Sequence, residues 1–141
     1  MSNPKKLTLL VDDDPICNSI SKVLLNKKFK SAQSDFHSEF EIVSLVNPVE
    51  GLKFLTESLL EKKYSTILVL LDINMPVMTG WEFLAEYEAL FQNQEEVSIY
   101  ILSSSVSKSD TERAAQNPNV VDFISKPITP PEVEKLYEKI K

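Results

Sequence analysis

Five short apolar runs recur along this chain, and their spacing limits the fold more than any other feature of the sequence. They begin roughly every 25 to 35 residues, at 7–11, 42–46, 67–71, 97–102 and, more weakly, 120–124. Residues 67–71 are apolar at every position, as expected of a parallel strand covered on both faces, whereas a half-exposed antiparallel strand would alternate. The runs therefore predict the strands of a parallel sheet.

Between the runs the apolar residues change to helical spacing. The stripes are Ile16, Ile20, Val23 and Leu24; then Leu52, Leu55 and Leu59; and finally Val133, Leu136, Tyr137 and Ile140. Strands and helices thus alternate, and right-handed crossovers leave few topologies for such a chain. The sequence predicts a doubly wound α/β fold: a five-stranded parallel sheet with helices on both faces.

Capping signals mark where the helices begin. The clearest are 47–50, 79–82 and 129–132, each with a capping side chain three residues before Glu, followed by Asp14-Pro15 and a weaker signal at 107–110 that opens a helix to about Ala115. Residues 27–41 are polar, lack a clear period and contain the only histidine, His37. This stretch is interpreted as a long connection or an extended helix end.

Composition bounds the class of protein. A chain of 141 residues is the size of one domain, so residues 1–141 are expected to share one core. The net charge of -6 argues against direct nucleic-acid binding, and the single cysteine, Cys17, excludes an intramolecular disulfide or a thiolate metal cluster. Residues 7–11 are too short for a signal peptide or a membrane span, so a cytoplasmic protein without a membrane partner is expected.

Polar residues follow the predicted strands, at the sheet edge where open α/β proteins bind ligands. They are Asp12, Asp13 and Asp14 after the first run, Asp72 after the third, Ser103, Ser104 and Ser105 after the fourth, and Lys126 after the fifth. Carboxylates brought together here would either raise the pKa of one of them or demand a cation, and oxygen ligands of this kind suit Mg²⁺. An ion with a lysine nearby could then hold a phosphoryl group.

Each candidate also has a simpler interpretation. Asp14 before Pro15 is better explained as a helix cap than as a metal ligand. Taken singly, the serines are turn residues, Lys126 a solvated charge, and Cys17 a small apolar filler. Asp72 could be a loop carboxylate, although the next capping signal comes seven residues later.

Four separated motifs occur in an order that resembles the receiver domain of two-component response regulators. They are VDDDP at 11–15, LLDINMPVMTGWE at 70–82, ILSSS at 101–105 and FISKPIT at 123–129. The resemblance covers the whole chain and implies a flavodoxin-like sheet of strand order 2-1-3-4-5.

The resemblance also implies a metal site and a phosphoacceptor. Asp13, Asp72 and the backbone carbonyl of Asn74 match the residues that hold Mg²⁺ in the family, and Asp12 matches one that reaches the metal through water. Asp72 matches the carboxylate that is phosphorylated.

Further matches concern the switch. Lys126 matches the lysine that contacts the phosphoryl group, and Pro127 a proline usually preceded by a cis peptide bond. Ser103 matches the switch hydroxyl, with Ser104 as the alternative, and Phe123 matches the aromatic switch residue.

Two departures from the family pattern affect surface connections. Asp72 lies 59 residues after Asp13, a longer interval than usual, and the excess falls in 27–41. Residues 117–119, Asn-Pro-Asn, replace a glycine-containing turn, which asparagine can also form.

The leading hypothesis is a phosphoacceptor switch, not an enzyme, that takes a phosphoryl group from a sensor histidine kinase or a histidine phosphotransfer protein and signals through altered protein contacts. One alternative is a Mg²⁺-dependent phosphohydrolase passing through an aspartyl phosphate, but Asn74 stands where that class commonly needs a second carboxylate. Another is an interaction module that does not depend on phosphorylation. The kinase and the downstream target are not specified by the sequence.

Overall fold

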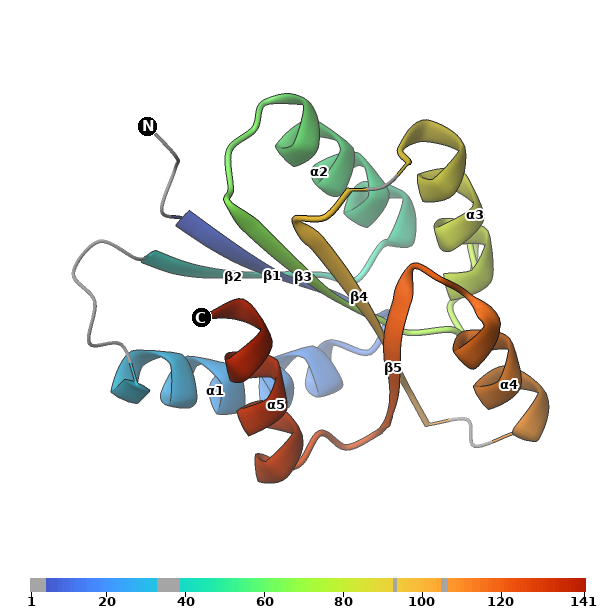
Figure 1. Ribbon diagram of the computed structural model, residues 1–141. Helices are drawn as coiled ribbons and strands as arrows, with labels where there is room; N and C mark the ends of the chain where they lie inside the picture. Colours follow the sequence, from blue (N-terminus) through green and yellow to red (C-terminus); the bar gives the residue numbers. More distant parts are fainter. Residues whose placement is uncertain (1–4, 33–38, 93, 105–106) are drawn as a thin grey trace.

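The computed structural model describes residues 5–32, 39–92, 94–104 and 107–141, and its centre is a parallel sheet (Figure 1). The strands follow the order β2-β1-β3-β4-β5, which confirms the predicted topology. Their bounds are β1 (Lys5–Val11), β2 (Glu39–Leu45), β3 (Thr66–Leu71), β4 (Val97–Ser103) and β5 (Val120–Ser125).

Five helices cover the two faces of this sheet. They are α1 (Pro15–Ala32), α2 (Pro48–Leu60), α3 (Gly80–Leu90), α4 (Lys108–Gln116) and α5 (Pro130–Ile140). In Figure 1, α2 and α3 lie on one side of the strands while α1 and α5 lie on the other. The chain therefore has the predicted doubly wound architecture.

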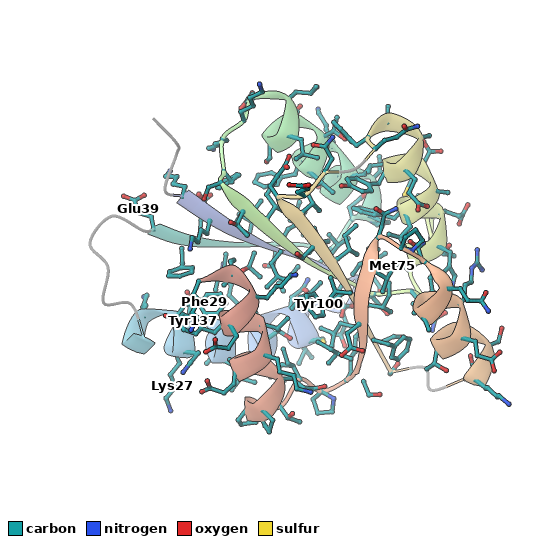
Figure 2. The ribbon with its side chains drawn as sticks, in the orientation of Figure 1. Lys27, Phe29, Glu39, Met75, Tyr100 and Tyr137 are labelled. Atoms are coloured by element: carbon teal, nitrogen blue, oxygen red, sulfur yellow. The ribbon has the colours of Figure 1, made fainter. Side chains whose placement is uncertain are left out.

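Alternate residues of the strands supply two separate apolar layers. Leu7, Leu9 and Val11 of β1 pack in the layer under α2 and α3, whereas Leu10 packs in the layer with α1 and α5. In the second layer, Phe29 and Tyr137 face each other with ring centroids 5.9 Å apart (Figure 2). Burial on both faces explains why the central strands are apolar without alternation.

The helix starts follow the capping signals of the sequence. The Asn47 side chain accepts hydrogen bonds from the amides of Val49 and Glu50, and Thr79 forms a reciprocal capping box with Glu82. The Ser107 hydroxyl likewise accepts the amide of Asp110 at the start of α4. These bonds satisfy donors that the first helical turn leaves free.

Helix α1 buries a different face from the one that its apolar stripe suggested. Ile16 is 70% exposed and Val23 is 65% exposed. The face toward the sheet carries Leu25 and Phe29 in its second half and small polar residues in its first half. The exposed stripe near the start of α1 thus belongs to the molecular surface.

The polar stretch at 27–41 is partly regular. Helix α1 continues to Ala32, which confirms an extended helix end, and β2 begins at Glu39, three residues before the apolar run. His37 lies outside the described residues. No helix in the described part of the chain is long and apolar enough to cross a membrane.

Candidate functional site

Asp12 and Asp72 end two neighbouring parallel strands at the carboxyl edge of the sheet. Val11 and Leu71 are paired in the register of β1 and β3, so the two aspartates that follow them lie next to each other. The backbone amide of Asp72 donates to the carbonyl of Val11 at 2.9 Å. Both side chains are buried, with 3% and 5% exposure.

Lys126 brings a positive charge to these two carboxylates from the end of β5. Its backbone amide donates to the Ser103 carbonyl at 2.9 Å. Its Nζ lies 2.5 Å from Oδ2 of Asp12 and 3.2 Å from Oδ2 of Asp72. The peptide bond to Pro127 is cis, as the resemblance implied.

Burial disfavours the charged forms of both Asp72 and Lys126, and the neighbouring charges modify the two pKa values differently. Burial raises the pKa of Asp72, the charge of Asp12 raises it further, and Lys126 and the Asn74 amide only partly offset this. Burial alone would lower the pKa of Lys126, but its hydrogen bond to Asp12 and the two carboxylate charges raise it overall. Lys126 therefore stays protonated beside a carboxylate pair with excess negative charge.

Asp13 completes an acidic cluster that fits a divalent cation. One carboxylate oxygen from each of Asp12, Asp13 and Asp72 lies within 4.8 Å of the other two. Ligand oxygens about 2.1 Å from Mg²⁺ stand roughly 3 to 4 Å apart, and hard oxygen donors are what this ion selects. Asp13 is exposed, so a cation here would keep access to water.

The loop after β3 is folded back against Asp72. The amide of Asn74 donates to Oδ1 of Asp72 at 3.4 Å, whereas the Asn74 side chain is exposed. Val77 has φ of 75°, and the Met78 amide donates to the Pro76 carbonyl across it at 2.8 Å. A β-branched residue rarely adopts this conformation, so the loop is locally strained.

Gly80 ends this loop where no side chain could fit. Its amide donates to the carbonyl of Ile73 at 2.8 Å. A Cβ at this position would lie 2.4 Å from the backbone oxygen of Asp72. The sequence contains only two glycines. Their scarcity was the one indication in the sequence that glycine is required at position 80.

The two candidate switch serines differ in burial. Ser103 is fully buried at the end of β4, whereas Ser104 is exposed. Phe123 on β5 is half-buried and packs at the margin of the apolar layer that contains Ile101, its neighbour in the β4–β5 register. The Ser103 side chain is thus buried, while its backbone carbonyl accepts the hydrogen bond from the Lys126 amide.

Asp14 acts as a helix cap, as its position before Pro15 predicted. Its carboxylate accepts the amides of Ile16 at 3.0 Å and Cys17 at 3.4 Å. Burial and the neighbouring Asp12 raise the pKa of the Cys17 thiol to about 11, in keeping with an inert side chain.

Sequence reasoning missed Asn18. It is 5% exposed, and its amide donates to the backbone carbonyl of Asp12 at 2.9 Å. This bond fixes the acidic loop to α1 and accounts for a polar residue on the sheet-facing side of the helix. Because Asn18 lies between two apolar stripe positions, the pattern alone gave no reason to select it.

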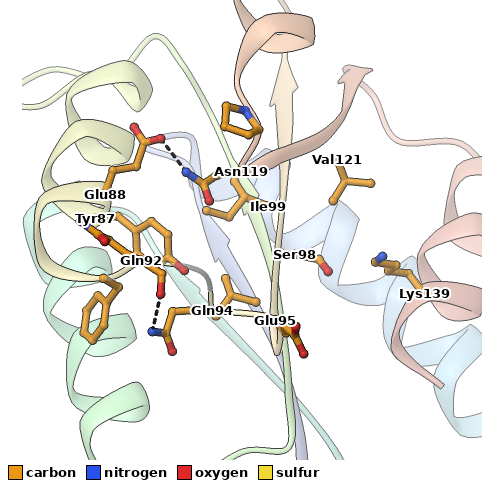
Figure 3. Close-up of a pocket in the computed structure, with 13 residues that line it drawn as sticks. Tyr87, Glu88, Gln92, Gln94, Glu95, Ser98, Ile99, Asn119, Val121 and Lys139 are labelled. Atoms are coloured by element: carbon orange, nitrogen blue, oxygen red, sulfur yellow. Dashed lines mark hydrogen bonds between the residues drawn. The ribbon is translucent and has the colours of Figure 1, made fainter.

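A cavity of about 580 Å³ lies at the opposite edge of the sheet (Figure 3). Its lining comes from the end of α3, the starts of β4 and β5, and Lys139 of α5. None of the predicted site residues lines it. This cavity is therefore separate from the acidic site.

These features define a class of protein: a doubly wound domain with a carboxylate cluster and a lysine at the carboxyl edge of its sheet. The family model described as the response regulator receiver domain matches residues 8–138. The chain belongs to this family, whose members are signalling modules of two-component systems.

Similar proteins agree with this assignment. The chain is 28% identical to the two-component response regulator ORR1 of Oryza sativa subsp. japonica over 91% of its length and 52% of the relative's. It is also 28% identical to Histidine protein kinase 1 of Candida albicans, over 99% of this chain but 5% of that protein. The chain thus spans about half the length of the first relative and a small part of the second.

A solved structure has nearly the same architecture. The two component response regulator from Cytophaga hutchinsonii superposes with a TM-score of 0.80 at 28% identity, covering 95% of both chains. The receiver protein from Dyadobacter fermentans, at 19% identity and a TM-score of 0.72, shares the fold.

Proposed function

We propose that this receiver domain accepts a phosphoryl group on Asp72 from a phosphohistidine of a sensor histidine kinase or a histidine phosphotransfer protein. The observation that carries the proposal is the buried Asp72 carboxylate, held between the Lys126 ammonium and the carboxylates of Asp12 and Asp13. A buried aspartate with a purely structural role would not need an ammonium group and two further carboxylates beside it.

In the reaction an Asp72 oxygen attacks phosphorus, so that a P–O bond forms while the P–N bond to the imidazole breaks. The bonding electron pair leaves on the imidazole nitrogen, which takes up a proton. The Lys126 ammonium lies beside Asp72, so it can pair with the phosphoryl oxygens and offset their negative charge during the transfer. The product is an acyl phosphate on Asp72.

Mg²⁺ would be held by Asp13, Asp72 and the Asn74 carbonyl, with Asp12 reaching it through water, and when bound it neutralises the developing phosphoryl charge. Of the three carboxylates in this set, Asp13 is the exposed one, so it supplies an accessible ligand. Asp12 is already oriented, because its Oδ1 accepts the Asp14 amide at 2.9 Å.

Ser103 is the residue that we assign to the response. Its buried hydroxyl would turn toward a phosphoryl oxygen, and Phe123 would move into the vacated space. The surface formed by α4 and β5 then changes, so that a local charge shifts the population of two conformations.

The surface beside the site favours a protein as the donor. Ile16 and Ile20 are 70% and 49% exposed and line a shallow cavity of about 250 Å³ together with Lys126 and Pro127. A contiguous apolar patch rimmed by polar groups is typical of a protein contact. The net charge of -6 disfavours nucleic acid as a partner.

The test is phosphorylation with Mg²⁺ and acetyl phosphate. The wild type should form one hydroxylamine-labile acyl phosphate per chain, and Asp72→Asn should form none. Asp14→Asn is the matched control, because it removes a nearby carboxylate while asparagine still caps α1. Retained label in Asp72→Asn would rule out this acceptor.

The same sample distinguishes a switch from a phosphohydrolase. A switch consumes donor to a stoichiometric limit set by slow loss of the acyl phosphate. Sustained turnover of simple phosphate esters, abolished in Asp72→Asn, would instead favour the enzyme.

A further inference from the structure

Helix α4 has few apolar contacts with the rest of the domain. Ala114 is its one buried residue among nine, whereas α5 buries Val133, Leu136 and Ile140. Apolar burial is the main force that fixes a helix to its sheet. The position of α4 must therefore depend more on side-chain links at its surface.

Such links come from Trp81, the second residue of α3. The indole Nε1 donates to Oδ1 of Asp110 at 3.3 Å, and the Arg113 guanidinium lies over the indole ring, with Cζ 4.6 Å from the centroid. Asp110 is held in turn, because its Oδ2 accepts the Ser107 hydroxyl at 2.9 Å. We call the contact of Trp81 with Asp110 and Arg113 the Trp81 clasp.

On the α3 side, the Trp81 clasp is connected to the backbone of Asp72, the proposed acceptor. Trp81 follows Gly80, whose backbone packs on the backbone oxygen of Asp72 and donates to Ile73. At the other end of α3, Glu88 accepts the Asn119 amide at 2.6 Å (Figure 3). Helix α3 thus links the acceptor loop to α4 and to the start of β5.

We propose that the Trp81 clasp holds α4 in the position it has while Asp72 is unmodified, so that Trp81 and Arg113 oppose the switch to the phosphorylated conformation. This inference rests on the proposed function. The Lys126 ammonium pairs with Oδ2 of both Asp12 and Asp72. A phosphoryl group on Asp72 would compete for this ammonium, so we assign the clasp to the conformation in which the Asp72–Lys126 pair is made. The proposed function changes the surface formed by α4 and β5, and a hydrogen bond of 3.3 Å between Trp81 and Asp110 tolerates little displacement of α4.

A contact made in only one of two states lowers the affinity of any ligand that selects the other. Beryllium trifluoride with Mg²⁺ mimics an aspartyl phosphate and is the probe. Trp81→Phe keeps the ring but loses the N–H donor, and Arg113→Met removes the cation. We expect each variant to bind the probe roughly two- to tenfold more tightly, the factor for one hydrogen bond or cation–π contact.

Lys28→Met is the matched control. Lys28 lies over the Tyr137 ring at 5.1 Å and pairs with Glu134 at 2.8 Å, so its loss breaks a similar contact between α1 and α5. It should leave the affinity for the probe at the wild-type value. Calorimetric titration measures all four proteins, since Trp81→Phe has no tryptophan left to report.

Hydrogen exchange tests whether the clasp holds α4 when the probe is absent, while the affinity for the probe tests whether it opposes the switch. The amides of α4 should exchange faster in both clasp variants without the probe, and α5 amides should not. Unchanged or weaker affinity in both variants, with wild-type binding intact, would overturn the clasp but leave the proposed function standing. A wild type that binds no beryllium trifluoride would overturn both.

Discussion

Asp72 holds its charge in surroundings that disfavour it. The side chain is 5% exposed, Asp12 lies beside it, and Lys126 is shared between the two carboxylates. The raised pKa of Asp72 records this imbalance. A buried carboxylate in such surroundings favours ligands that bring positive charge or neutralise its negative charge.

The raised pKa of Asp72 makes a prediction about stability and pH. The folded state binds the proton more tightly than the unfolded chain, so this contribution is fully present below the unfolded carboxyl pKa and is lost as the pH rises through the raised folded value. With chelator present, Asp72→Asn should therefore be more stable than the wild type at neutral pH, and the difference should vanish in acid.

Urea unfolding between pH 3 and 8 measures this difference. Asp14→Asn, which changes an exposed cap, should follow the wild type throughout. A less stable Asp72→Asn at neutral pH would mean that the ion pair with Lys126 outweighs burial.

The residues of the site could be predicted from the sequence where they directly follow a strand of the sheet. Asp12, Asp72 and Lys126 follow parallel strands, so topology alone brings them together. Asn18 was not predictable, because its role depends on the direction in which one helix turn faces.

At the scale of elements, α1 presents the apolar residues that its helical pattern would normally bury. Ile16 and Leu60 are both 70% exposed, but Ile16 borders the site and Leu60 ends α2 on the other face. Ile16→Ser should slow phosphotransfer from a histidine-bearing protein roughly tenfold, in the range of one apolar contact. Phosphorylation by acetyl phosphate should not change.

Leu60→Ser is the control with equal exposure, and it should leave both reactions unchanged. Each substitution should alter the free energy of unfolding by about 0.5 kcal/mol or less, as is usual for exposed positions. Equal slowing by both donors would place the effect of Ile16 on the chemistry and not on docking.

The first residues of the helices were predicted well, because caps depend on hydrogen bonds between residues that are close in the sequence. Only Leu24 of the apolar stripe predicted for α1 packs against the core, because a second set of apolar residues on that helix faces the sheet. Leu25 and Phe29 meet the sheet, while Ile16, Ile20 and Val23 do not. Periodicity identifies a helix but selects its inner face only when a single stripe is apolar.

For the whole molecule, Mg²⁺ binding at the carboxylate cluster should stabilise the fold. A ligand that binds only the folded state at ten times its Kd contributes about 1.4 kcal/mol, which is a rise of a few degrees in Tm for a domain of this size. Asp13→Asn should lose most of this rise, since it removes an exposed member of the cluster.

Thermal unfolding followed by Trp81 fluorescence checks the effect, with NaCl at matched ionic strength as the control for screening. The same rise in NaCl and MgCl₂ would attribute the stabilisation to relief of the overall charge. A rise specific to MgCl₂ that persists in Asp13→Asn would move the ion to other ligands.

The direction of the strands has a practical consequence for handling the molecule. Parallel strands place Asp12 and Asp72 at one edge of the sheet, while Lys5 begins β1 at the opposite edge. Helix α5 runs back to that same edge, where Lys139 lines a cavity with the starts of β4 and β5 (Figure 3). A surface tether or a fluorescent label attached at residue 5 or 141 would therefore leave the approach to Asp72 open in immobilised protein.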